Sequence, residues 1–219
     1  MEHEVREYEN PTVAAHKAAA FIVERAQQAV LAKGTFTFAV SGGDSPWPMF
    51  EALTTLDMPW NSTVIYQVDE RAAPLHSRSR NLENLRRSLE PVAAIIEPMP
   101  VDGDLDEGAR EYEALLPDRF DLVHLGLGPD GHTASLLLDD PVLDVTDRMV
   151  WATQEYMGHR RMTLTYPALA RAEQILWLII GTGERDVLPL LLSGDASIPA
   201  GRVRAERSLI FADVAAMAT

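Results

Sequence analysis

The sequence predicts an α/β fold, with a mostly parallel, doubly wound, Rossmann-like sheet and helices on both faces. Strand and helix signals alternate along the whole chain, which is typical of parallel sheets. Several predicted strands are apolar at every position, as expected of strands covered on both faces. Three strands end in glycines or acidic turns, which a parallel sheet brings to one edge. No repeat or linker interrupts the chain, so residues 1–219 are expected to form a single domain.

The first helix has the clearest boundaries. Asn10 is a good cap, Pro11 suits the first helical position, and Gly34 supplies the stop after Lys33. The segment that follows, Thr35–Val40, is β-branched and aromatic and is predicted to be a strand. The remaining elements expected up to residue 116 are a helix from Pro46 to Leu56 with Ser45 as its cap, a strand at 62–68, and helices at 81–89 and 105–116.

The second half of the chain is expected to supply more strands than helices. Residues 122–127 form the third clear strand, and residues 175–180, ILWLII, a fully buried one. A short helix is expected at 133–138. The further elements expected are extended segments at 149–153, 162–165 and 208–212, a helix at 167–172, and a helix that follows the glycine turn 181–183 and runs to 192.

The composition is that of a soluble, cytoplasmic globular protein. Hydrophobic residues make up 47%, no segment approaches the roughly 20 apolar residues of a membrane span, and the first residues are too acidic for a signal peptide. The formal net charge of −14 disfavours nucleic acids and anionic membranes as partners. The lack of cysteine excludes disulfides, a thiol nucleophile and thiolate metal ligands. A small anionic substrate is still compatible, because it responds to the local field of a cleft.

The most informative segment is 120–138, FDLVHLGLGPDGHTASLLL, a hydrophobic strand that runs into a glycine-rich turn. Such turns lie at the rim of an α/β sheet, where ligands bind. Imidazole titrates near pH 6.5, so His132 is a candidate base, with Asp130 as the carboxylate that orients it. The alternative is a structural histidine, and His124 within the strand is interpreted as a satisfied core histidine. No histidine or acid has the spacing of a metal site.

A second glycine-rich turn, residues 41–46 (SGGDSP), follows a strand and opens a helix. Gly42 and Gly43 let the backbone approach a ligand, and free N–H groups at a helix start attract an anion. Ser41 and Ser45 would add hydroxyl donors. The alternative is a tight turn with a serine cap. The glycine spacing and the lack of lysine exclude a dinucleotide fingerprint and a nucleotide P-loop.

Three further polar segments follow or form predicted strands. Asp69-Glu70-Arg71 offers an arginine for a phosphate or a carbonyl, with the adjacent carboxylates holding it in place. Arg161 is a second basic point on an extended segment, and residues 181–185, GTGER, repeat the strand–glycine–helix arrangement. For each of these segments alone the alternative is a solvated surface, which is the commoner case for an isolated Asp-Glu-Arg.

Taken in order, SGGDSP, VDER, LGLGPDGHTASL, RRMTLT and ILWLIIGTGERDVL resemble the 6-phosphogluconolactonases, whose superfamily includes glucosamine-6-phosphate deaminase/isomerase. The resemblance covers about residues 11–216, and DGHTAS is its most specific block. It implies hydrolysis of 6-phosphogluconolactone to 6-phosphogluconate, the second step of the oxidative pentose phosphate pathway. It also implies that no metal or cofactor is needed, that the substrate is a small anionic sugar phosphate, and that the protein is a monomer.

The resemblance implies a role for each candidate residue. His132 is the general base, a role worth roughly 10²–10⁴ in rate, and Asp130 orients it. Arg71 and Arg161 are anion or oxyanion partners, and the sequence does not separate the two roles. The residues assigned to substrate or phosphate binding are Ser41, Gly42, Gly43, Ser45, Asp69, Arg161 and Arg185.

Four positions decide between hypotheses within this resemblance. Deaminases carry a carboxylate five residues after the histidine, where this chain has Leu137. Because that acid is missing, a deaminase or sugar-phosphate isomerase is only the second hypothesis. Asp44 puts an acid beside the phosphate loop, and we expect it to face solvent or an arginine. Glu184 stands where the family commonly has lysine, with Arg185 as a candidate replacement. These two acids favour the third hypothesis, a non-catalytic sugar-phosphate binder.

Overall fold

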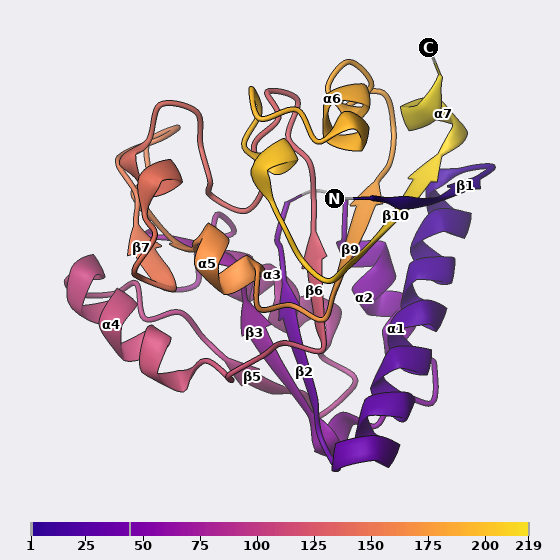
Figure 1. Cartoon of the computed structure of the whole chain (residues 1–219). Coiled ribbons are helices and arrows are strands. Elements are labelled where there is room, and N and C mark those ends of the chain that lie inside the picture. Colours follow the sequence, from indigo (N-terminus) through magenta and orange to yellow (C-terminus); the bar gives the residue numbers. More distant parts are fainter. Residues whose placement is uncertain (1, 44, 219) are drawn as a thin grey trace.

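The structure is a computed structural model that describes residues 2–43 and 45–218. Its centre is a seven-stranded sheet in which every neighbouring pair is parallel, in the order β1-β10-β9-β6-β2-β3-β5 (Figure 1). The predicted mostly parallel sheet is therefore confirmed. Its strands are β1 (Glu4–Tyr8), β2 (Phe36–Val40), β3 (Thr63–Gln67), β5 (Ile95–Glu97), β6 (Leu122–Leu125), β9 (Gln174–Ile179) and β10 (Arg207–Asp213).

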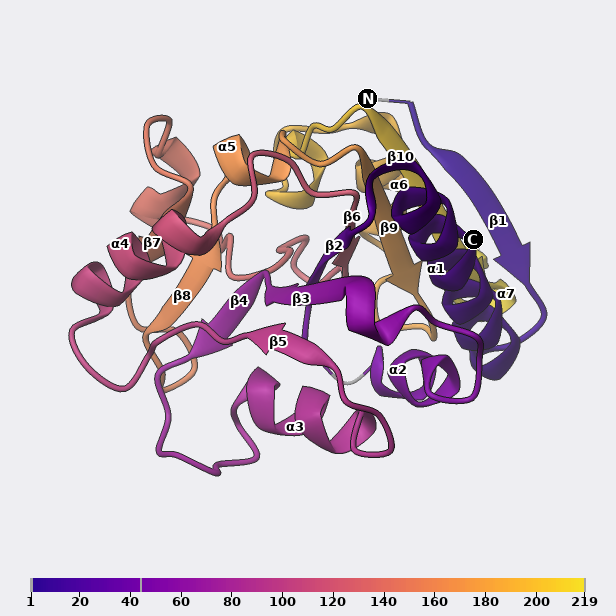
Figure 2. The ribbon, with the colours of Figure 1, turned by 90° about the horizontal axis from the view of Figure 1, so that it is seen from below.

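Helices cover both faces of this sheet, as predicted for a doubly wound fold (Figure 2). Along β9, Leu176 and Leu178 pack into one hydrophobic cluster, and the alternating Ile175, Trp177 and Ile179 pack into the other. The first cluster contains side chains of α1 (Pro11–Lys33), α2 (Trp47–Leu53) and α3 (Asn81–Ser88). The second contains those of α4 (Leu105–Leu115), α5 (Tyr166–Leu169), α6 (Leu188–Ser193) and α7 (Val214–Met217). Single 3₁₀ turns lie at Trp60–Ser62, Pro141–Asp144 and Ala200–Arg202.

A second, three-stranded antiparallel sheet lies beside the first and was not predicted. Its order is β4 (Asp69–Arg71), β8 (Arg161–Leu164) and β7 (Val150–Ala152). The chain passes from one sheet to the other at Val68. The Val68 N–H donates to the Val40 carbonyl of β2 at 2.9 Å, and the Val68 carbonyl accepts from the Leu164 N–H of β8 at 2.7 Å. The segment after β3 is therefore a strand that turns away from the main sheet.

The boundaries of α1 match the prediction, whereas those of α2 do not. The Asn10 side chain accepts from the Val13 N–H at 2.9 Å, and Gly34 ends α1 with a φ of 84°. The prediction that Ser45 caps the second helix was wrong, because α2 begins at Trp47 and has no side-chain cap. A cap at Ser45 would bond the N–H three residues on, and Pro48 has none.

The helix predicted at residues 133–138 was also wrong, because this segment is a pair of turns. Ala134 has a left-handed φ of 51°, and an isolated bridge joins Thr133 to Leu136. Both polar side chains of the segment bond to distant groups. Thr133 Oγ1 donates to the Gly126 carbonyl at 2.8 Å, and Ser135 Oγ donates to Asp69 at 2.7 Å. Such bonds compete with helix formation. The helix predicted after the glycine turn at 181–183 begins only at Leu188.

Among the described residues, no helix combines the length and the apolar character needed to cross a membrane.

Candidate active site

A cavity of about 250 Å³ lies at the carboxyl edge of the seven-stranded sheet. The chain leaves β2 toward β3 on one side and leaves the adjacent β6 toward β9 on the other, so the cavity lies at the topological switch point. Open α/β sheets bind their ligands at this position. The predicted residues that line the cavity are Ser41, Gly42, Gly43, Ser45, Asp69, Arg71, His132 and Arg161.

The loop that follows β6 holds the imidazole and its carboxylate. Asp130 Oδ1 lies 2.5 Å from His132 Nδ1 and also accepts from the His132 backbone N–H at 3.1 Å. The predicted contact between these two residues is therefore present. Burial opposes ionisation of Asp130, but the His132 backbone N–H, charge and ring together hold the pKa of Asp130 below its ordinary value. A carboxylate at Nδ1 favours the tautomer that leaves Nε2 as the proton acceptor.

Gly128 creates the space that the imidazole occupies. A Cβ at this position would overlap the Cε1 and Nδ1 atoms of His132. The Gly128 N–H in turn donates to the His132 carbonyl at 2.8 Å, which closes the loop on itself. Gly131 has a φ of +83°, a conformation that side chains other than glycine rarely adopt. The ring position is therefore set by the backbone of this one loop.

The loop that follows β2 forms the opposite wall of the switch point. Gly42 lies so close to the Asn81 amide that a Cβ there would overlap it, and Gly43 has a φ of +107°. Ser41 and Ser45 line the cavity as predicted. The prediction for Asp44 concerns a residue outside the described ones.

Arg71 and Arg161 come from the smaller sheet and are direct cross-strand neighbours on β4 and β8. Both line the cavity. Burial lowers the pKa of Arg161; the charge of Asp69 partly raises it, and the charge of Arg71 lowers it further. Like charges directly opposite each other destabilise a sheet. An anion bound between them would remove this repulsion.

The carboxylates beside Arg71 do not hold its guanidinium, which corrects the prediction. Arg71 Nη1 donates to the Ser79 carbonyl at 2.9 Å. Glu70 is buried and accepts from the backbone N–H groups of Asn81 and Leu82, both at 2.8 Å, so it caps α3 instead. Burial, against these hydrogen bonds, raises the pKa of Glu70.

Asp69 lines the cavity, and both of its carboxylate oxygens have protein partners. Oδ2 accepts from Ser135 Oγ at 2.7 Å and Oδ1 from Asn81 Nδ2 at 3.1 Å. Three segments therefore meet at the carboxylate of Asp69: strand β4, helix α3 and the loop that follows β6. Sequence reasoning singled out neither residue. Ser135 lies in the DGHTAS block but its role there was not recognised, and Asn81 belongs to no glycine turn or charged cluster.

Glu184 lines the cavity, whereas its neighbour Arg185 is exposed and does not. The placement gives no support to Arg185 as a substitute for the family lysine. Burial raises the pKa of Glu184, the charge of Asp213 adds to this, and the charge of His132 opposes it. A carboxyl with a raised pKa therefore lies in the cavity wall, near enough to His132 to sense its charge.

Tyr156 is a further residue that the sequence did not single out. Its ring lies edge-on to that of His132, with centroids 6.3 Å apart, and the Arg161 guanidinium lies 5.1 Å from its centroid. Tyr156 thus lies between the imidazole of His132 and the guanidinium of Arg161. A cation over an aromatic face is attracted by the ring quadrupole.

Among residues 2–43 and 45–218, no group of three or more histidine, aspartate or glutamate side chains is arranged to hold a metal ion.

The fold and the site define a class of protein, an α/β protein with an imidazole–carboxylate pair and an arginine pair in one switch-point cavity. The family model described as glucosamine-6-phosphate isomerases/6-phosphogluconolactonase matches residues 9–211. The chain belongs to this family, which confirms the resemblance seen in the sequence.

Individual relatives agree with this assignment. The chain is 31% identical to a 6-phosphogluconolactonase of Synechocystis over 220 residues, which cover 92% of this chain and 91% of that protein. It is 38% identical over 193 residues to the human GDH/6PGL endoplasmic bifunctional protein, covering 80% of this chain. The match spans about a quarter (24%) of that longer protein. A crystal structure of 6-phosphogluconolactonase from Thermotoga maritima superimposes with a TM-score of 0.87 at 27% identity, covering 97% of this chain and 100% of that one.

Proposed function

We propose that this protein hydrolyses 6-phosphogluconolactone to 6-phosphogluconate. The observation that carries the proposal is that His132, which pairs with Asp130, lines one switch-point cavity together with Arg71 and Arg161. The first pair suits activation of water, and the second suits an anionic substrate. The names of the relatives and of the similar crystal structure support the same reaction.

The proposed reaction begins with proton transfer. His132 Nε2 takes a proton from water while the water oxygen attacks the lactone carbonyl carbon, and the carbonyl becomes an oxyanion. The bond between this carbon and the ring oxygen then breaks. The imidazolium returns its proton to the departing ring oxygen, which becomes a hydroxyl group, and the product acid loses a proton to solvent. Asp130 stabilises the imidazolium between the two transfers.

The proposed roles of the basic residues follow from charge. One of Arg71 and Arg161 binds the phosphate and the other the oxyanion, since guanidinium groups donate strong, charge-assisted hydrogen bonds to both. Gly42, Gly43 and the hydroxyls of Ser41 and Ser45 add donors on the opposite wall.

Two alternatives make different predictions. A deaminase or isomerase is disfavoured because Leu137, which stands at the position of the deaminase acid, is an apolar side chain only 3% exposed. A non-catalytic sugar-phosphate binder is favoured by one observation, the carboxyl of Glu184 in the cavity wall.

The test is hydrolysis of freshly made 6-phosphogluconolactone by the wild type and by His132→Ala. We expect the wild type to exceed the spontaneous rate clearly, and the variant to lose about 10²–10⁴ in kcat. A wild type that matches the spontaneous rate while binding 6-phosphogluconate in a calorimeter would establish the binder. Release of ammonia from glucosamine-6-phosphate would establish the deaminase.

We further propose that the chain folds as one domain and acts as a monomer. Buried side chains of both sheets, such as Val68, Met162 and Ile175, belong to one hydrophobic cluster, which supports a single cooperative unit. A single unfolding transition in a calorimeter tests the single domain, and light scattering tests the monomer. A cytoplasmic location stays a prediction from the composition, and one relative carries the word endoplasmic in its name.

A further inference from the structure

His124 lies in the wall of the cavity, and no described residue is a hydrogen-bond partner of its ring. It is on β6, and its side chain is only 1% exposed. Within the part of the chain that the structure describes, neither Nδ1 nor Nε2 has a partner. The ring packs edge-on against Phe50 of α2, with centroids 5.9 Å apart. His124 is therefore a core residue, as expected, but no described group satisfies its ring.

Ser41 is a second buried polar group beside it. Val40, the last residue of β2, is the register partner of His124, and the next N–H, that of Ser41, donates to the His124 carbonyl at 3.1 Å. Ser41 is 4% exposed, and its Oγ also has no partner among the described residues. Both residues line the cavity. Buried polar groups in native proteins are nearly always hydrogen-bonded. The His124 ring and the Ser41 hydroxyl in one wall therefore indicate that a bound group supplies their hydrogen-bond partners.

The chemistry of the two groups defines that occupant. Burial lowers the pKa of His124 to about 3, so its ring is neutral at physiological pH. A neutral imidazole has one donor and one acceptor, and a serine hydroxyl also has both. A phosphate dianion offers only acceptors and an ammonium group only donors. A hydroxyl group offers both and matches this wall.

We propose that His124 and Ser41 form a subsite for one hydroxyl group of the ligand, which makes them specificity-determining residues for the sugar. Their place in the fold separates them from the arginine pair. His124 lies on β6 of the seven-stranded sheet and packs against Phe50 of α2, and Ser41 directly follows β2. Arg71 and Arg161 belong to the smaller sheet. The proposal takes only the class of ligand, a polyhydroxylated sugar-acid phosphate, from the proposed function, and it rests on that function to this extent.

The test uses His124→Leu and two probes, 6-phosphogluconate and inorganic phosphate, in a calorimeter. Inorganic phosphate has no sugar hydroxyls and reports the anion site alone. We expect His124→Leu to lower the affinity for 6-phosphogluconate about tenfold, equivalent to about 1.4 kcal/mol, and to leave the affinity for inorganic phosphate unchanged. The variant also exchanges an unpaired buried imidazole for an apolar side chain, so its Tm should rise by about 2–4 °C.

Two further variants make the result interpretable. His3→Leu is the matched control, since the His3 ring is hydrogen-bonded to Ser208 Oγ at 2.7 Å and does not line the cavity. It should leave both affinities unchanged and should not raise the Tm. Ser41→Ala should reproduce the selective loss for 6-phosphogluconate. This smaller change also tests the subsite if His124→Leu fails to fold.

Three outcomes would overturn the subsite. One is an unchanged affinity for 6-phosphogluconate in both cavity variants, and another is an equal loss for both probes. The third is a fall in the Tm of His124→Leu with unchanged binding, which would assign His124 a structural partner such as a buried water. Absence of lactone hydrolysis by the wild type would overturn the proposed function alone, because the binding measurements do not require turnover.

Discussion

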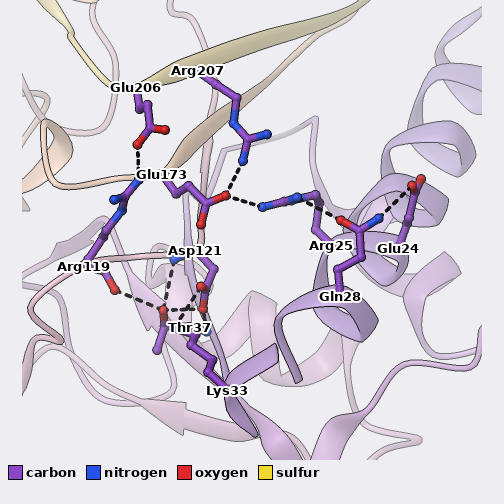
Figure 3. Close-up of polar contacts among 10 residues, drawn as sticks. All are labelled: Glu24, Arg25, Gln28, Lys33, Thr37, Arg119, Asp121, Glu173, Glu206 and Arg207. Atoms are coloured by element: carbon purple, nitrogen blue, oxygen red, sulfur yellow. Dashed lines mark hydrogen bonds and ion pairs between the residues drawn. The ribbon is translucent and has the colours of Figure 1, made fainter. Parts of the chain in front are cut away.

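Arginine side chains lie at both edges of the seven-stranded sheet, and their partners differ. At the amino edge, Glu173 accepts from Arg25 at 2.7 Å and also pairs with Arg207 (Figure 3). At the carboxyl edge, Arg71 and Arg161 are opposite each other on neighbouring strands, and neither forms an ion pair with a described carboxylate. The amino edge pairs its charges, whereas the carboxyl edge places like charges together.

The difference shows which edge serves stability and which serves binding. The two ion pairs that share Glu173 at the amino edge together contribute about 1 kcal/mol or less. At the carboxyl edge, the two opposed arginines and the buried polar groups of His124 and Ser41, which have no partner among the described residues, are expected to destabilise the folded chain. Features that cost stability persist where a ligand completes them. Substitutions at the two edges should therefore have opposite effects on stability and activity.

Among the substitutions that test this comparison of the two edges, the largest effect is expected from Gly128→Ala, which removes no functional group. The added Cβ overlaps the His132 ring and must displace it from Asp130. Misplacing a catalytic group by about 1 Å costs about 10²-fold, so kcat for lactone hydrolysis should fall by about that factor. Steady-state kinetics with fresh lactone measures it.

Gly103→Ala is the matched control, because a Cβ at Gly103 meets no atom within 4 Å and its loop is outside the cavity. Its kcat should equal that of the wild type. If Gly128→Ala kept full activity, the imidazole would not be the base, or its position in the loop would not matter.

The second effect concerns the arginine pair. Charge-assisted hydrogen bonds contribute about 1.5–3 kcal/mol, so Arg71→Ala and Arg161→Ala should each lose about tenfold to a hundredfold in kcat/KM. A rise in KM alone identifies the phosphate ligand, and a fall in kcat alone identifies the oxyanion partner. This split resolves the two roles that the sequence leaves open.

The stability of the same variants tests the comparison of the two edges. Removing one of two opposed guanidinium groups should leave the Tm unchanged or raise it. Arg71→Lys and Arg161→Lys keep the charge but lose the planar fork, so they should keep the wild-type Tm with reduced kcat/KM. A marked fall in Tm in the alanine variants would mean that the pair is structural.

The sequence predicted the parts of the site that depend on neighbours along the chain. Asp130 and His132 lie in one loop, so their contact follows from the glycine turn that carries them. The cap at Asn10 and the stop at Gly34 are local in the same way. Periodicity and composition likewise predicted most strands of the parallel sheet.

Contacts between distant segments were not predictable in this way. β4 has only three residues, Asp69-Glu70-Arg71. Because polar and apolar side chains do not alternate in it, its sequence does not predict a strand. The meeting of Arg71 with Arg161 depends on that strand. The polar edge strand β1, Glu4–Tyr8, was missed for the same reason, since four of its five residues are exposed. Whether the ring of His124 finds a hydrogen-bond partner likewise depends on which side chains surround it in space.

A smaller effect is expected from Glu184, as a dependence of binding on pH. Because the pKa of Glu184 is raised, the group loses its proton at a higher pH than an ordinary carboxyl, and its charge then repels phosphate. The affinity of the wild type for 6-phosphogluconate, relative to Glu184→Gln, should therefore fall as pH rises from about 5 to about 8. Two charges about 4 Å apart interact by about 1 kcal/mol in water. The ratio of the wild-type affinity to that of Glu184→Gln should therefore change by about fivefold at most.

Calorimetric titration across this pH range measures the effect. Comparing the two proteins at each pH cancels the titration of the phosphate itself, which has a pKa near 6. Glu90→Gln, at an exposed position outside the cavity, should follow the wild-type profile. Parallel profiles for the wild type and Glu184→Gln would show that this carboxyl does not sense the ligand.

The smallest effect on activity is expected at the amino edge. Glu173→Gln keeps the shape of the side chain but removes the charge between Arg25 and Arg207, at a loss of about 1 kcal/mol or less. The Tm should fall by up to about 2–4 °C, and less in high salt, which screens the ion pairs of the wild type. Glu24→Gln, where Glu24 only accepts from Gln28 at 3.1 Å, should leave the Tm unchanged. Lactone hydrolysis should be unaffected by both, and a change in kcat with Glu173→Gln would mean that the two edges are coupled through the strands between them.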